Sequence, residues 1–161
     1  MSKPIIFQTT EVAKLLKASR FVLNRLMLRC NIETSFGSRA GRGSRLLFTP
    51  EDLATLALAY WLFRCGLRMR AIRQALDDGH IKRMWKHLTS VERFEEVGTH
   101  LDFLVTWRSA KGRDAFQEVR LENDFAGVQR ILKSVSEYGF VVIPIGRLLK
   151  ELTEAIQKYQ L

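Results

Sequence analysis

Cysteine, proline and histidine are scarce in this sequence of 161 residues, and acidic residues are outnumbered by basic ones. The two cysteines, Cys30 and Cys65, form neither a disulfide framework nor a zinc ligand pair, which predicts free thiols in a reducing cytosol. The histidines follow no common metal-ligand spacing, so no metal site is expected. The most apolar stretch, 53–63, is about half the length that crosses a bilayer, and no secretory signal begins the chain. We therefore expect a soluble cytoplasmic protein with no cofactor and no membrane partner.

The sequence also contains no recognisable catalytic set. Ser19 has no histidine or acid arranged beside it, so we interpret it as a helix cap rather than a nucleophile. The glycines of segment 36–45 are not followed by Lys-Ser or Lys-Thr at the start of a helix, which excludes the usual phosphate-binding loop of nucleotide enzymes. We expect no enzymatic activity.

Basic charge is concentrated in the first third of the chain. Residues 1–50 contain nine Lys and Arg against two Asp and Glu, which accounts for +7 of the total charge of +9. Residues 51–80 contain four of each, and residues 81–161 contain thirteen against eleven. An excess that only served solubility would be spread evenly, whereas a concentrated one is typical of a face that docks a polyanion. Nucleic acid or an anionic membrane surface is the class of partner that this charge favours.

Two short helices are predicted at the start of this basic region. Apolar residues at helical spacing predict a helix of about two turns ending at Leu16, with Thr9 or Thr10 as the capping hydroxyl. A second helix is predicted from Ser19, its cap, to Cys30. The turn between them has about three residues and lacks the usual glycine.

A basic hairpin and two further helices are predicted next. Segment 36–45 is rich in glycine and arginine and is typical of a hairpin tip, with a return strand over 46–48. The sequence Thr-Pro-Glu-Asp at 49–52 is a strong start signal for the helix over 53–65, which is apolar on nearly every side and ends at the following glycine. A further short helix is expected over 68–76.

The remainder of the chain predicts a small α+β unit. An alternating pattern over 100–108 and a second run over 116–121 predict two strands. A helix from 123 or 124 to 138, a buried strand over 140–145 and a last helix from Gly146 complete the order β-β-α-β-α. A weaker pattern over 80–98 places the domain boundary there, which divides the chain into residues 1–80 and residues 81–161.

The near-balanced charge and apolar sheet of residues 81–161 indicate dimerisation or effector sensing. A homodimer formed through this region is expected, because symmetric pairing doubles the contacts of a small DNA-binding domain. A small-molecule effector and a protein partner both stay open.

Three stretches of the first half combine helix starts, a short strand and apolar helix positions in a fixed order: Thr10 to Leu16 with Ser19, Ser44 to Leu53, and Gly66-Leu67 with Ala71-Ile72. They closely resemble the MerR family of bacterial transcriptional regulators, over about residues 7–76, although the C-terminal region is atypical. The resemblance implies a winged helix-turn-helix within a mainly α fold. It also implies a DNA-binding homodimer whose second helix enters the major groove while the wing contacts the flanking backbone.

The chemistry of the residues gives candidate DNA contacts independently of that resemblance. If the apolar residues of the second helix face inward, then Arg20, Asn24 and Arg25 lie on or beside its outward face. Arginine binds guanine and asparagine binds adenine in the major groove, so these three are candidates for base contacts. The candidates for phosphate contacts are the neighbouring cations of the helices and the hairpin: Lys14, Lys17, Arg29, Arg39, Arg42 and Arg45.

The sequence thus predicts a sequence-specific, double-stranded DNA-binding transcriptional regulator located in the cytoplasm at the nucleoid. One alternative is an architectural DNA-binding protein of phage or plasmid origin, of the excisionase or partition type, for which several phased sites with bending would be expected. Another is a MerR-like module that binds a partner protein, for which affinity for DNA would be absent or indifferent to salt.

Overall fold

The computed structural model of the chain describes residues 6–36, 46–79, 82, 103–109, 116–122, 125–134 and 140–159. Most of these residues are helical, as predicted, and the strands form a two-stranded and a three-stranded sheet. Within the described ranges, no helix combines the length and apolarity that a bilayer crossing requires.

The chain begins with a short strand followed by two helices: β1 (Phe7–Gln8), α1 (Thr9–Leu15) and α2 (Arg20–Cys30). The two helices correspond to the predicted pair. As predicted, Ser19 is the N-cap of α2, and its hydroxyl oxygen accepts a hydrogen bond from the backbone N–H of Val22 at 3.2 Å.

The cap of α1 differs from the prediction. Thr9 and Thr10 both lie inside the helix, and Gln8 is the N-cap residue. The backbone N–H of Gln8 donates to the Glu11 carboxylate at 2.6 Å. The reason is β1, which holds Gln8 extended in a sheet, so that the helix starts before either threonine could act as the cap.

The turn between α1 and α2 reverses the chain without glycine. Lys17 adopts the left-handed backbone conformation, with φ of 49°. The backbone N–H of Ala18 donates to the carbonyl oxygen of Ala13 at 2.9 Å, which satisfies a terminal carbonyl of α1. Glycine is the usual residue at such a position because a Cβ atom makes this conformation unfavourable. Lysine stands here in place of the usual glycine, so the sequence contains no glycine that would mark the turn.

The third helix, α3 (Pro50–Arg64), begins with the predicted signal. The Thr49 hydroxyl accepts from the Asp52 N–H at 3.2 Å, and the Asp52 carboxylate accepts from the Thr49 N–H at 2.9 Å. Gly66, with φ of 85°, follows the helix, and the chain continues into α4 (Met69–Asp77). As expected, α3 is buried widely, through Leu53, Ala54, Leu56, Ala57, Leu58, Ala59 and Leu62.

The return strand β2 (Leu47–Phe48) pairs antiparallel with β1, and Phe7 lies opposite Phe48. The Leu47 N–H also donates to the carbonyl oxygen of Phe36 at 3.2 Å, so Phe36 and Leu47 lie side by side in an antiparallel bridge. The predicted strand is therefore present, with β1 as its main partner. The predicted hairpin tip covers 36–45, and all of it except Phe36 lies outside the described residues.

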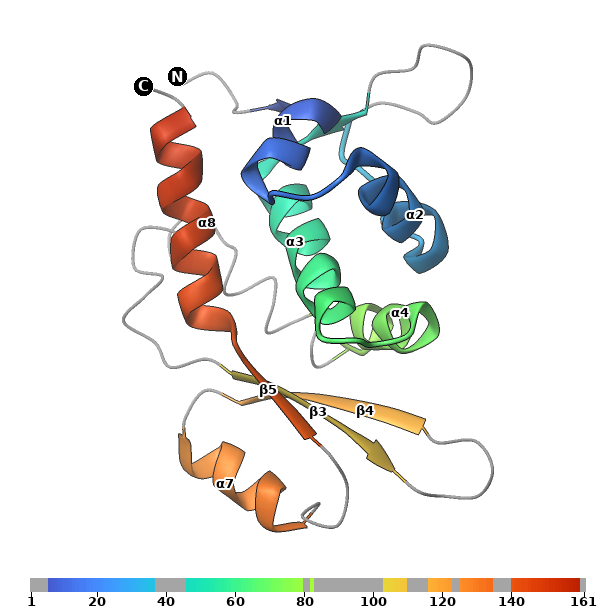
Figure 1. Cartoon of the computed structure of the whole chain (residues 1–161), viewed down its shortest axis with the longest axis vertical. Coiled ribbons are helices and arrows are strands. Elements are labelled where there is room, and N and C mark those ends of the chain that lie inside the picture. The colour runs from blue at the N-terminus through green and yellow to red at the C-terminus, as the bar shows by residue number, and fades with distance from the viewer. Residues whose placement is uncertain are drawn as a thin grey trace.

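Five elements are described in the C-terminal part, in the predicted order: β3 (Phe103–Ser109), β4 (Phe116–Glu122), α7 (Phe125–Ser134), β5 (Phe140–Pro144) and α8 (Ile145–Tyr159). The three strands pair antiparallel in the order β4-β3-β5. Figure 1 shows the sheet between α4 and α7, and α4 contacts β4 while α7 contacts β3 and β4. Helix α8 begins at Ile145, one residue earlier than expected. The expected end of α7 at 138 lies outside the described residues.

A single hydrophobic cluster includes residues of both α8 and the N-terminal helices. Leu149, Leu152 and Ile156 of α8 belong to the same core as the buried residues of α1, α2 and α3. Helix α8 also contacts α1 (Figure 1). The predicted domain boundary after residue 80 lies outside the described residues, so the division into 1–80 and 81–161 stays a prediction.

Candidate nucleic-acid interface

Helix α2 divides its residues into a buried and an exposed face. Leu23, Leu26, Met27 and Cys30 are at most 2% exposed, and Val22 is half-buried at the edge. With 3.6 residues per turn, the exposed positions fall within about half of the circumference of the helix. They are Arg20, Phe21, Asn24, Arg25, Leu28 and Arg29.

The three candidates for base contacts lie on this exposed face. Arg20 is the first residue of α2, and Asn24 and Arg25 follow one turn later. Helix α2 contains no acidic residue. Neither Arg20 nor Arg25 forms an ion pair with a carboxylate of the described residues. Their positive charge is therefore not compensated within this part of the molecule.

Three of the six candidates for phosphate contacts are described. Lys14 lies in the last turn of α1, Lys17 in the turn, and Arg29 in the last turn of α2, and all three side chains are exposed. None of them forms an ion pair within the part of the chain that the structure describes. The other three, Arg39, Arg42 and Arg45, lie outside the described residues.

Asp52 joins the two sides of the arginine-rich segment (residues 37–45). Its carboxylate accepts hydrogen bonds from the backbone N–H and the hydroxyl of Ser35, each at 2.9 Å, and from the Thr49 N–H at 2.9 Å. Ser35 precedes the segment and Thr49 follows it. Local sequence predicts for Asp52 only a role in starting α3, because the partner Ser35 lies 17 residues away along the chain. The same carboxylate thus fixes where the arginine-rich segment leaves and rejoins the fold.

Helix α4 adds arginines that the sequence analysis did not assign. Arg68, at its N-cap, and Arg70 and Arg73 within it are exposed, and α4 packs against α2. Arg73 pairs with Asp77 at 3.6 Å, whereas Arg68 and Arg70 form no ion pair among the described residues. The net charge of the sequence gives no sign of these arginines, because residues 51–80 contain equal numbers of basic and acidic residues. Arg68 and Arg70 thus add exposed cations on a helix that packs against α2.

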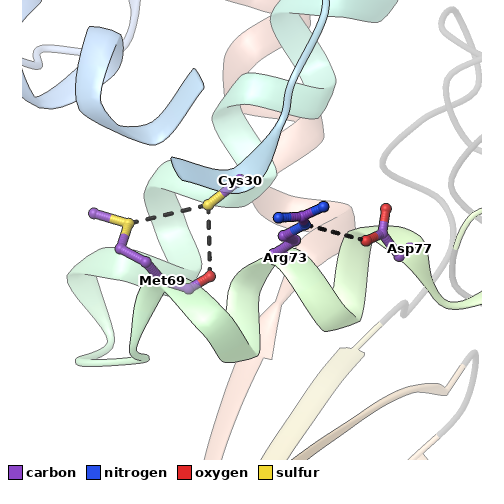
Figure 2. A network of polar contacts seen from close by, with 4 residues as sticks. All are labelled: Cys30, Met69, Arg73 and Asp77. Atoms are coloured by element: carbon purple, nitrogen blue, oxygen red, sulfur yellow. Dashed lines mark hydrogen bonds and ion pairs between the residues drawn. The ribbon is translucent and has the colours of Figure 1, made fainter. Parts of the chain in front are cut away.

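The buried end of α2 is held against α4 by Cys30. Its Sγ lies 3.7 Å from the carbonyl oxygen of Met69 and 4.0 Å from the Met69 Sδ, beside the Arg73–Asp77 pair (Figure 2). Burial raises the pKa of the Cys30 thiol to about 11, so the thiol is protonated at neutral pH and is a weak donor rather than a nucleophile. Burial also raises the pKa of Cys65. Both cysteines are free, and no group of metal-ligating side chains occurs among the described residues.

The described part of the site thus consists of an exposed cationic helix face, a basic turn beside it and a supporting helix with further arginines. Its buried side is apolar and fixes α2 against α3 and α4. Comparison with models of known protein families and with curated proteins finds no match to this chain.

Proposed function

We propose that this chain binds double-stranded DNA as a sequence-specific transcriptional regulator, with α2 in the major groove. The observation that carries this proposal is the set of exposed cations on α1, the turn and α2. No carboxylate of the described residues neutralises them. Duplex DNA has one negative charge per about 1.7 Å of its axis, so a set of exposed cations without ion pairs among the described residues is suited to it. These cations are Lys14, Lys17, Arg20, Arg25 and Arg29.

The dimensions of α2 are compatible with this role. Its eleven residues correspond to about 16 Å of helix, and the major groove, about 12 Å wide, admits one helix. The N-terminal residues of a recognition helix contact base edges, which assigns this role to Arg20, Asn24 and Arg25. Cations at the ends of the face, Lys17 and Arg29, contact phosphates and orient the helix without selecting sequence.

The winged helix-turn-helix and the MerR-type relationship belong to the same proposal. In it, α1 and α2 are the helix-turn-helix, and the arginine-rich segment is the wing on the flanking backbone. The element order α1, α2, β2, α3, α4 and the antiparallel bridge between Phe36 and Leu47 support this interpretation.

We also propose that two copies pair through residues 81–161 and bind a two-fold symmetric site. Symmetric pairing of two protomers on two half-sites is the usual way for a domain of this size to obtain sufficient contacts. Sedimentation equilibrium of the full chain, alone and with its DNA site, is the measurement. One protomer on an asymmetric site would contradict the pairing.

The test of DNA binding begins with selection of bound fragments from genomic DNA and continues with titrations of one fragment at several salt concentrations. We expect the affinity to fall by orders of magnitude between about 50 and 200 mM salt. Arg29→Ala should weaken binding to all sequences and reduce the salt slope by about 1. Arg130→Ala is the matched control, because it removes the same charge from an exposed position on α7. Binding indifferent to salt, or equal effects of the two variants, would contradict the proposal.

Asn24→Ala tests base selection separately. The amide of Asn24 is expected to contact one adenine, so the variant should lose preference at one base position and keep the salt slope of the parent protein. The measurement is a repeat of the selection with the variant. An unchanged base preference at every position would remove Asn24 from the base contacts.

A further inference from the structure

Two large apolar side chains are exposed on α2. Phe21 is 74% exposed and Leu28 69%, more than any other large apolar residue whose side chain the structure describes. Single exposed apolar residues are ordinary on protein surfaces. These two, however, lie seven residues apart on one helix, about two turns, and therefore share a face. Neither belongs to the core, so folding does not account for them.

Helix geometry places this apolar pair in the middle of the candidate DNA-binding face. At about 100° per residue, Phe21 and Leu28 lie near the centre of the exposed arc. Arg20 and Asn24 lie on one flank, and Arg25 and Arg29 lie on the other. The face is thus an apolar strip, formed by Phe21 and Leu28, with polar or cationic groups along both sides.

The flanking charges decide between two occupants of this strip. A second copy docked through the same face would bring Arg20, Arg25 and Arg29 of both copies together, with no acid on α2 to oppose them. The major groove presents the complementary arrangement, since phosphates border it on both sides and the C5-methyl groups of thymine are exposed on its floor. Charge complementarity therefore favours DNA.

We propose that Phe21 selects thymine by contact with its C5-methyl group and that Leu28 extends this apolar contact. The inference rests on the proposed function, because it needs α2 in the major groove. Phe21 is the second residue of α2, within the turn that reaches base edges. Asn24, three residues later, is its neighbour on the helix surface. An adenine for Asn24 and a thymine methyl for Phe21 together define a recognition subsite that contains A·T pairs.

The test removes the methyl group from the DNA and the ring from the protein. In the selected duplex, each thymine is replaced in turn by deoxyuridine, which lacks only the C5-methyl group. We expect one replacement to weaken binding by the full chain about fourfold, the equivalent of about 0.8 kcal/mol for one buried carbon group. The same replacement should have no effect on Phe21→Ala. Arg130→Ala, on α7 and outside the proposed contact, is the control, and it should keep the sensitivity of the parent protein at that thymine.

The controls separate failure of this inference from failure of the proposed function. The midpoint of thermal unfolding of Phe21→Ala should equal that of the parent protein, because the Phe21 side chain is exposed. If Phe21→Ala binds DNA too weakly to measure, Phe21→Leu is used in its place. If no thymine is sensitive, or Phe21→Ala is as sensitive as the parent, the inference is wrong, while salt-dependent binding still supports the function. If the parent shows no salt-dependent affinity, both fail. If Phe21→Ala leaves DNA affinity unchanged and abolishes self-association in sedimentation, a second copy covers the strip and the inference is overturned.

Discussion

Lys17 combines an unfavourable backbone conformation with an exposed charge. Its φ of 49° lies in the left-handed region, which costs a residue with a Cβ about 1–2 kcal/mol. The Tyr60 hydroxyl lies 3.5 Å from its carbonyl oxygen, so α3 contacts the turn at this residue. Glycine would fit the backbone better but would remove a cation from the candidate interface. The position therefore allows stability and binding to be separated.

Lys17→Gly should raise the free energy of unfolding by about 0.5–1 kcal/mol. This is the difference between the strain relieved, about 1–2 kcal/mol, and the chain entropy that glycine adds to the unfolded state, about 0.5–1 kcal/mol. Lys17→Ala is the matched control, because it removes the same charge and keeps the strain. Both variants should bind DNA more weakly than the parent, as measured by titration, whereas only the glycine variant should gain stability in urea unfolding. Equal stabilities would show that the turn is not strained.

The thiol of Cys30 gives the molecule a pH dependence in the alkaline range. Its pKa in the folded chain, about 11, lies above the ordinary value of 9.0 because burial disfavours the thiolate. A raised pKa contributes stability that is complete below about pH 9 and is lost as the pH rises toward 11.

We expect the stability of the parent relative to Cys30→Ala to fall between pH 9 and 11 by up to about 2 kcal/mol. Both proteins should include Cys65→Ala so that only one thiol titrates. Urea unfolding at intervals across this range is the measurement. A constant difference would mean that Cys30 is not protected from water in the folded state.

Among the elements, the residues on either side of the arginine-rich segment are joined by one carboxylate. Asp52 accepts hydrogen bonds from both Ser35 and Thr49 and also completes the cap of α3. An amide at this position retains one acceptor oxygen and loses the charge. Loss of the carboxylate should therefore affect both the start of α3 and the link between Ser35 and Thr49.

Asp52→Asn should lower the free energy of unfolding by about 1–2 kcal/mol, because charge-assisted hydrogen bonds at a helix cap are replaced or lost. It should also weaken DNA binding although it makes the chain more positive. Asp77→Asn gives the same change of charge at an exposed acid of α4 and should leave stability within about 0.5 kcal/mol of the parent. Stronger DNA binding by both variants would show that net charge, rather than the position of the segment, determines affinity.

At the scale of the whole molecule, α8 shares a core with the N-terminal helices. Leu149 is fully buried in the cluster that also contains Val12 of α1 and Leu62 of α3. The apolar side of the last helix is therefore used within the chain. This packing makes the stability of the candidate interface depend on residues more than a hundred positions away.

Leu149→Ala should lower the free energy of unfolding by about 3 kcal/mol, the usual cost of truncating a fully buried leucine. Hydrogen exchange of the amides in α1 and α3 should accelerate together with that of α8. Leu148→Ala, at a half-buried position of the same helix, is the control and should have a smaller effect. Faster exchange confined to α8 would mean that the two parts of the chain unfold separately.

The main elements of the fold follow from local sequence patterns. The caps at Ser19 and Thr49, the apolar periodicity of α2 and α3, and the order of the C-terminal strands and helices depend on neighbouring residues, so local pattern was sufficient to predict them. The prediction of a threonine cap for α1 was wrong, because the start of this helix depends on the pairing of β1 with β2, about forty residues away. The left-handed Lys17 had no signal, since its conformation is imposed by the packing of the helices on either side.

Packing between distant segments determines which charges of the described residues remain uncompensated and which of their apolar side chains remain outside the core. Periodicity placed Arg20, Asn24 and Arg25 outward, but the burial of α2 was needed to find Phe21 between them. The joint role of Asp52 and the shared core of α8 with α1 were likewise invisible in the sequence. The physical reason is that hydrogen bonds, ion pairs and burial between distant segments depend on distances in space, which spacing along a chain does not specify.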